Sequence, residues 1–280
     1  MEATHSSSAM HRPNPLDRLA NNGSSYGTYV RAFSMVLGFL VLTTSLYPVS
    51  PGRDTNSGSD ESIAANLKYF VIMDAGSSGT RVHVFRWDGA KPGIPDLQMP
   101  SHTLKRNPGL SSFANEPAAA GASLKELLEF AAQKVPPSKR PETPLFIKAT
   151  AGLRRVETSK ASLILDSCAK FVQVNSDFQF DRSHAAVISG QEEALLGWMA
   201  VNYLRWTAQS DIETSTRKVS SSASSVGTIE MGGASSQVTF ALDSPGAAAV
   251  NADQDSKQHL KAVSMPEWGI DVKLYARRYA

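Results

Sequence analysis

The sequence predicts an α/β fold, and two observations carry this prediction. First, segments with the apolar pattern of strands alternate along the chain with segments of helical spacing, which is typical of α/β proteins. Second, the order strand, acid, Gly/Ser turn, strand occurs twice, as MDAGSSGTRVHVF and as IEMGGASSQVTF. This echo predicts two similar half-domains that face each other across a cleft. A chain of 280 residues has room for one or two domains.

The chain before residue 67 does not have the composition of a soluble domain. Residues 1–29 are rich in Ser, Asn and Pro, which predicts a disordered tail. Residues 30–49 contain an uncharged run, Ala32 to Val49, that is close to the minimum length for a membrane-spanning helix. Three arginines precede this run: Arg12, Arg18 and Arg31. By the positive-inside rule the tail stays in the cytosol and the rest is translocated, as in a single-pass type II membrane protein with a signal anchor.

A cleaved signal peptide is the alternative for this segment, although its charged leader would be about 30 residues long. Residues 50–66 are a linker by composition. The single cysteine, Cys168, excludes an intrachain disulfide and is expected in a core. A net charge of +2 gives no electrostatic reason to expect a nucleic-acid partner.

The folded part opens with two expected strands, Lys68 to Met73 and Arg81 to Trp87, joined by a tight Gly/Ser turn. A third strand is expected at Leu104 to Arg106. A helix is expected from about Ala118 to Lys134, because two prolines follow it and break the pattern.

The next elements alternate in type. The stretch TPLFIKATAGLR contains a short apolar strand that ends in a turn. Glu157 to Val172 has helical spacing of Leu and Ile. A short strand is expected to end at Ile188, and a helix to begin near Gln191. TIEMGGASSQVTF then repeats the opening arrangement of strand, turn and strand.

The two Gly/Ser turns have the composition of anion sites. Glycine lets backbone N–H groups approach a ligand, and successive N–H groups in a turn form a concavity that binds anions. Two facing turns would clamp a chain of phosphates. Asp74 and Glu230, which precede the turns, would hold the waters around a divalent cation that bridges those phosphates. Each turn by itself is also compatible with an ordinary tight hairpin.

Other candidate residues have two interpretations from the residues alone. Glu192 and Glu193 begin a helix, where acids are favoured by the helix dipole, but one of them could also take a proton from an attacking water. Thr150 could cap a helix or orient a water, and Arg154 could lie near phosphates. The six histidines show no zinc-binding spacing.

Four stretches, DAGSSGTR, ATAGLR, SGQEEALLGW and MGGASSQVTF, together resemble the first four conserved regions of the nucleoside triphosphate diphosphohydrolases, the apyrase family. The resemblance covers roughly residues 68–240. It implies an actin-like (RNase H-like) fold of two lobes, with lobe I at residues 67–187, complete or nearly so, and the start of an incomplete lobe II at residues 188–280. It also implies hydrolysis of nucleoside di- and triphosphates to the monophosphate, with Ca²⁺ or Mg²⁺.

The resemblance assigns roles to individual residues. Glu193 matches the general base, and Thr150, Ser235 and Gln237 match positions that orient the attacking water or phosphate. Asp74 and Glu230 would hold the metal through water. The residues that would bind phosphate or nucleotide are Gly76, Ser77, Ser78, Gly79, Thr80, Arg81, Arg154, Gly232, Gly233, Ala234 and Ser235.

Three residues depart from the family pattern, and one of them is Ala194, which replaces a common Gly after the Glu pair and could crowd the loop. Glu230 stands where the family usually has Asp, which moves the carboxylate by one methylene. Gly79 stands where many cell-surface members have His, which resembles the endomembrane and plant-type members. We therefore expect the lumen of the Golgi or another endomembrane compartment, with the cell surface as the alternative.

The family also continues past the point where this chain stops, before a fifth conserved region. The expectation is a truncated second lobe with exposed apolar surface. Two alternatives follow for the function. One is a catalytically inactive apyrase-like fragment, and the other is an exopolyphosphatase-type phosphatase of the same superfold.

Overall fold

The computed structural model describes residues 66–90, 95–208, 225–243, 250, 254–265 and 270–279. The predicted tail, the predicted membrane-spanning helix and nearly all of the predicted linker lie outside these residues. Within the described ranges, no helix combines the length and the apolar character that a membrane crossing requires.

The first sheet is mixed and has five strands. These are β1 (Leu67–Ala75), β2 (Thr80–Asp88), β3 (His102–Arg106), β4 (Leu145–Ala149) and β5 (Ala185–Val187), in the spatial order β3-β2-β1-β4-β5. The first three strands are antiparallel, and β4 and β5 run parallel to β1. The centre of β1 is buried, as its continuous apolar sequence predicts for a central strand.

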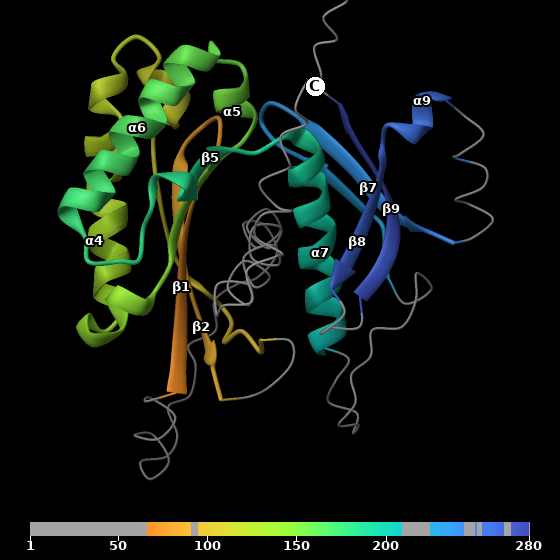
Figure 1. The fold of residues 1–280 in the computed structure, drawn as a ribbon, viewed down its shortest axis with the longest axis horizontal. Helices are drawn as coiled ribbons and strands as arrows, with labels where there is room; N and C mark the ends of the chain where they lie inside the picture. The colour runs from red at the N-terminus through yellow and green to blue at the C-terminus, as the bar shows by residue number, and fades with distance from the viewer. Residues whose placement is uncertain are drawn as a thin grey trace, which may run out of the picture.

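Helices α4 (Lys125–Lys134), α5 (Ala151–Arg154) and α6 (Thr158–Asn175) lie on one side of this sheet (Figure 1). The α-helix that was expected from Ala118 begins only at Lys125, after two 3-10 segments. The reason lies in α6: Ser167 accepts a hydrogen bond from the backbone N–H of Gly121 (3.0 Å) and donates one to the carbonyl of Ala118 (2.8 Å). Contacts with α6 therefore satisfy backbone groups here that an α-helix would pair internally.

The second part of the chain has a helix and an antiparallel sheet. Helix α7 (Gly190–Ala208) packs on the sheet formed by β6 (Thr228–Met231), β7 (Ser236–Leu242), β9 (Ile270–Tyr279) and β8 (Leu260–Met265), in that spatial order. Thr239 in β7 donates a hydrogen bond to the carbonyl of Ala194 in α7 (3.1 Å). A short helix, α9 (Gln254–Lys257), precedes β8. Strands β8 and β9 were not predicted from the sequence.

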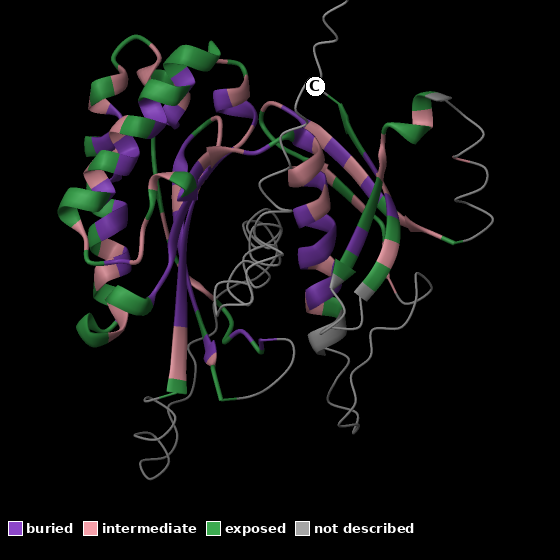
Figure 2. Ribbon diagram, in the orientation of Figure 1, coloured by how far each residue is buried: buried purple, intermediate pink, exposed green. Residues whose placement is uncertain are grey.

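Two apolar cores hold these layers together. One lies between the first sheet and the helices α4 and α6, whose buried residues face the strands (Figure 2). The other joins the opposite face of that sheet, including Phe70 and Phe85, to α7, where Trp198 is fully buried. Near the end of α7, the Tyr203 hydroxyl accepts a hydrogen bond from Leu97 N–H (2.9 Å) and donates one to Pro95 C=O (2.7 Å). The second core and this link fix how the two sheets face each other.

Apolar side chains are exposed on the second sheet. Ile229 and Met231 in β6 are 77% and 83% exposed, and Phe240 and Tyr279 are also exposed. The expectation that this part of the chain leaves apolar surface uncovered is therefore met. Glu230, between the first two, points the other way because side chains alternate along a strand.

Candidate active site

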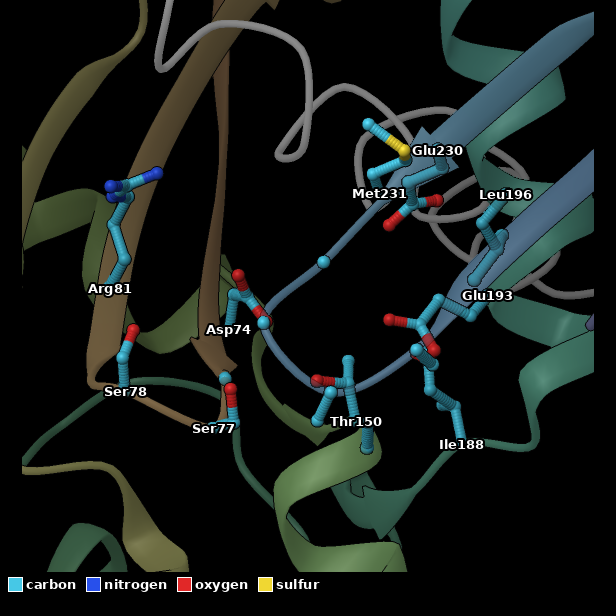
Figure 3. A pocket seen from close by; sticks show the side chains of 16 residues that line it. Asp74, Ser77, Ser78, Arg81, Thr150, Ile188, Glu193, Leu196, Glu230 and Met231 are labelled. Atoms are coloured by element: carbon cyan, nitrogen blue, oxygen red, sulfur yellow. The ribbon is translucent and has the colours of Figure 1, made fainter. Parts of the chain in front are cut away.

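A pocket of about 220 Å³ lies where the two Gly/Ser turns meet (Figure 3). The turns come from β1–β2 in the first sheet and from β6–β7 in the second. Twelve of the predicted site residues line it: Asp74, Gly76, Ser77, Ser78, Arg81, Thr150, Glu193, Glu230, Gly232, Gly233, Ala234 and Ser235. The structure therefore brings together residues that lie far apart in the sequence. Their roles in catalysis stay predictions.

The two strand–turn–strand units have the same internal register. In the first, Ala75 pairs with Thr80 around a four-residue turn, and Asp74 pairs with Arg81. In the second, Met231 pairs with Ser236 around a turn of equal length, and Glu230 pairs with Gln237. Each acid thus lies two residues before its turn. The order of strand, acid, Gly/Ser turn and strand that occurs twice in the sequence therefore also forms the same structure twice.

The two turns approach each other closely. The second turn is closed by a hydrogen bond from Gly232 N–H to Ser235 C=O (2.8 Å). A Cβ on Gly233 would lie 2.9 Å from Ser77 Oγ of the first turn, closer than carbon and oxygen atoms normally approach. Gly233 therefore permits the approach that a larger residue would prevent.

Three carboxyl groups face one another across the pocket: Asp74, Glu193 and Glu230 (Figure 3). Burial raises the pKa of Asp74 to about 6; Arg81 opposes this and Glu193 adds to it. Burial raises the pKa of Glu230 to about 8, with further increases from the charges of Glu193 and Asp74. Glu193 is paired with Arg154, whereas Asp74 and Glu230 form no ion pair within the described residues, and a bound cation would relieve the repulsion among the three carboxyls.

The residues present fit a cation that is held largely through water. Oε2 of Glu230 is buried and has no hydrogen-bond partner within the described chain, so it can accept one from a metal-bound water. Across the same described residues, no three His, Cys, Asp or Glu side chains lie close enough to hold a metal ion directly. Mg²⁺ commonly takes only one or two carboxylates and keeps several waters, with substrate phosphates as further ligands.

Glycine in α7 makes room for the longer acid at position 230. A Cβ on Gly197 would lie 3.0 Å from Glu230 Oε2. Glycine in a helix interior lowers the stability of the helix by about 1 kcal/mol relative to alanine. The space that the Glu230 carboxyl needs explains why glycine stands at position 197. The extra methylene of Glu230 is accommodated against α7, one turn along from Glu193.

The two neighbouring glutamates at the start of α7 have different environments. Glu192 accepts a hydrogen bond from Ser189 N–H (2.7 Å), and its own N–H donates to Ser189 Oγ (3.1 Å). This reciprocal pair is a capping box. Glu193 instead lines the pocket. The helix-start interpretation therefore describes Glu192, and the pocket is faced by Glu193.

Arg154 holds Glu193 from the first-sheet side. The guanidinium lies 2.7 Å from Glu193 Oε2, and both side chains are largely buried, at 13% and 12% exposed. Arg154 also donates to Ile188 C=O (2.9 Å) and to Ser235 Oγ (3.3 Å). It does not line the pocket, and its hydrogen bonds are with protein groups around the predicted base. Phosphate binding by Arg154 stays a prediction.

Three more predicted residues lie beside the pocket rather than in its wall. Gln237 is buried and donates to Ser235 Oγ (2.9 Å). Thr80 is buried at the start of β2, and Gly79 packs against the end of β3.

Thr150 precedes α5 and lines the pocket. Its side chain makes no capping hydrogen bond, so the capping alternative is not supported.

Four residues that line the pocket were not predicted from the sequence: Ala151, Ile188, Leu196 and Met231. All four are apolar, and no local signal marks Ala151, Ile188 or Met231. Leu196 lies three residues after Glu193, on the same face of α7, and this spacing was the one available clue. Met231 follows Glu230 directly and is highly exposed.

Comparisons with known proteins identify the family to which the chain is similar. Residues 61–279 match the GDA1/CD39 (nucleoside phosphatase) family. The chain is 36% identical over 218 residues to "Probable apyrase 6" of Arabidopsis thaliana, covering 77% of this chain and 36% of that protein. It is 37% identical over 193 residues to "Golgi apyrase" of Schizosaccharomyces pombe, covering 62% and 32%. It is 34% identical over 203 residues to mouse "Ectonucleoside triphosphate diphosphohydrolase 2", covering 70% and 38%.

The chain thus spans about a third of the length of these relatives. Among solved structures, that of nucleoside triphosphate hydrolases from Neospora caninum is similar with a TM-score of 0.50 and 17% identity. The similarity covers 76% of this chain and 44% of that one, and it is a likeness of fold.

Proposed function

Because the chain belongs to the GDA1/CD39 family of nucleoside phosphatases, we propose that it hydrolyses nucleoside di- and triphosphates to the monophosphate and orthophosphate with the help of a divalent cation. The observation that carries this proposal is the position of Glu193. It faces two Gly/Ser turns of equal construction in one pocket with two further buried acids.

The reaction follows from what each residue can do there. The backbone N–H groups and hydroxyls of the two turns bind the terminal phosphate. Glu193 accepts a proton from a water whose oxygen bonds to that phosphorus, while the bond from phosphorus to the bridging oxygen breaks. The nucleotide leaves with the bridging oxygen and the phosphate leaves as orthophosphate. A triphosphate passes through this step twice to reach the monophosphate.

Other residues orient these groups. Thr150 and Ser235 line the pocket and have hydroxyls that can hold the attacking water. Gln237 donates a hydrogen bond to Ser235 Oγ and so holds that hydroxyl in position. Arg154 holds Glu193 toward the pocket through the 2.7 Å ion pair.

A Ca²⁺ or Mg²⁺ ion would be held by Asp74 and Glu230 through water. When bound, it would neutralise charge on the phosphate oxygens and lower the barrier to attack by water. The two acids fit this role because burial raises both pKa values and leaves Glu230 Oε2 without a partner among the described residues.

The proposal includes an architecture and a location. We propose two actin-like lobes, residues 67–187 and residues 188–280, with the pocket between them. The separate first and second sheets, each with its own turn, support this division. We also propose that residues 30–49 anchor the protein in the membrane, with residues 1–29 in the cytosol and residues 50–66 as linker.

The catalytic part would then face the lumen of the Golgi or a related compartment. A relative named "Golgi apyrase" supports this choice. The cell surface is the alternative location, because another relative is named "Ectonucleoside triphosphate diphosphohydrolase 2".

The test is phosphate release by the full chain in detergent, with Ca²⁺ or Mg²⁺, from UDP, GDP, ATP and polyphosphate. Glu193→Gln should lower kcat by about 10²- to 10⁴-fold, because the general base is lost. Glu192→Gln is the matched control, since Gln also serves in a capping box and its kcat should stay within a few-fold of wild type. Chelation of the cation should abolish release.

Two results would contradict the proposal. Folded wild-type chain that releases no phosphate from any nucleotide would be an inactive member of the family. Release from polyphosphate alone would identify an exopolyphosphatase-type enzyme instead.

A further inference from the structure

Two cations lie side by side next to the first turn. Arg81 in β2 and Lys105 in β3 are directly paired in the antiparallel register. Paired residues project from the same face of a sheet. Arg81 lines the pocket on the side opposite Glu230 and Met231 (Figure 3), so Lys105 extends the same wall.

Neither cation has a direct partner: within the part of the chain that the structure describes, the side chains of Arg81 and Lys105 form no hydrogen bond or ion pair. Both charges lower the pKa of Asp74, the neighbouring acid on β1. The neighbouring Arg106 is different, because it projects from the other face and forms an ion pair with Glu126 of α4. Like charges directly opposite on neighbouring strands destabilise a sheet. A bound anion would remove this repulsion.

The lysine reaches over the first turn. A Cβ placed on Gly79 would lie 2.9 Å from Cε of Lys105 and 2.7 Å from the carbonyl oxygen of Arg106. The side chain of Lys105 therefore lies against the backbone of Gly79, and its ammonium group is one bond farther out. A larger residue at position 79 would occupy this space.

We propose that Lys105 is a further phosphate-binding residue of the pocket, which acts with Arg81 on the non-bridging oxygens of the terminal phosphate held by the first turn. The inference rests on the proposed function, and it names a residue that no motif in the sequence marks. The ligand class is a phosphate dianion, either at the end of a nucleotide or as free orthophosphate. Hydrogen bonds between such oxygens and an ammonium are short and strong.

The test measures orthophosphate directly on the full chain in detergent. Isothermal titration gives the Kd for inorganic phosphate, and inhibition of nucleotide hydrolysis by phosphate gives a second value. Lys105→Met should raise both about tenfold, the size expected for an exposed charge-assisted hydrogen bond. KM for the nucleotide should rise by a similar factor with a smaller change in kcat. Lys105→Arg should recover most of the affinity.

Arg106→Met is the matched control. It removes the same charge one residue away, but on the face that packs toward α4, so the Kd for phosphate should stay within about twofold of wild type. If Lys105→Met and Arg106→Met raised the Kd for phosphate equally, the loss would come from the lower net positive charge and not from a contact with Lys105, and the inference would be overturned. An unchanged Kd in Lys105→Met would also overturn it, as would wild-type chain that binds no phosphate.

Failure of the proposed function gives a different result. In that case wild-type chain releases no phosphate from nucleotides, and the titration with orthophosphate still decides whether Lys105 binds the anion. Since Lys105 is exposed and its removal relieves the repulsion with Arg81, its substitution should not lower the thermal unfolding midpoint, which separates a binding role from a folding defect.

Discussion

The ion pair between Arg154 and Glu193 makes a strong prediction about stability. It connects α5 beside the first sheet to α7 on the second, and 39 residues separate the two partners. Substitution of Arg154 by Met keeps the length of the side chain and removes its charge and its donors. Glu193 then remains largely buried without its partner.

The expected cost follows from the geometry. The charged atoms are 2.7 Å apart, and the side chains are 13% and 12% exposed, so solvent screens the pair weakly. Removal of one partner from a buried pair costs about 3–5 kcal/mol, because the other charge stays buried. Arg154→Met also leaves the Ile188 carbonyl without its donor. The double variant Arg154→Met with Glu193→Gln has no uncompensated charge and should be destabilised by less than the sum of the single changes.

The assay is a double-mutant cycle of the free energy of unfolding in urea, at pH 7 and in cation-free buffer. The lost bond to Ile188 is common to both variants that carry Arg154→Met, so it cancels from the coupling energy. We expect a coupling of about 2 kcal/mol. The pair Lys125–Glu129 on α4 is the control: it is 4.0 Å apart and 70% and 58% exposed. Its coupling should be about 0.5 kcal/mol or less.

A coupling for Arg154–Glu193 no larger than that of the exposed pair would refute the reasoning. It would mean that the two side chains do not form a dry ion pair in solution. Arg154 would then be available for phosphate, as the resemblance implied.

Three further predictions concern other parts of the molecule. Gly197→Ala should push the Glu230 carboxyl out of place and lower kcat about tenfold, while urea unfolding shows no loss of stability, because alanine favours the helix. Burial raises the pKa values of Glu230 and Asp74 to about 8 and about 6, so the folded chain binds protons more tightly than the unfolded chain. Without a cation its stability should therefore fall as pH rises from about 4 to 8, and thermal unfolding of Glu230→Gln beside wild type should show a weaker fall. Tyr203→Phe removes the links to Pro95 and Leu97 and should cost about 1–3 kcal/mol in urea unfolding, with kcat retained; an unchanged stability would argue against these buried hydrogen bonds.

Much of the first sheet could be predicted from the sequence because its signals are local. The apolar run of β1, the Gly/Ser turn and the alternation in β2 lie within one short stretch, and the observed strands extend the predicted ones by one or two residues. The same is true of α6, since a helix was expected from Glu157 to Val172 and the observed helix is Thr158–Asn175. Strands β8 and β9 were not predicted, although Ile270, Val272 and Leu274 of β9 alternate with polar residues in the pattern of a half-buried strand, so this local signal was missed.

The environment of the candidate base shows where local reasoning stops. The sequence left Glu192 and Glu193 open between helix capping and catalysis. The capping box depends on a spacing of three residues, Ser189 to Glu192, and so is a local feature. The contact of Glu193 with Arg154 depends on how the second sheet faces the first.

The sequence by itself determined most strands and helices of the first part, both turns and the acids that precede them, since each depends on residues within one hairpin or one helical turn. The start of α4 is the exception, because contacts with α6 set it. Only the tertiary structure decided that the two turns meet, that Gly197 makes room for Glu230, and that Lys105 lies over Gly79. Those contacts join residues from different strands and helices. Their distances are set by the register of β2 with β3 and by the apolar core that packs α7 against the first sheet.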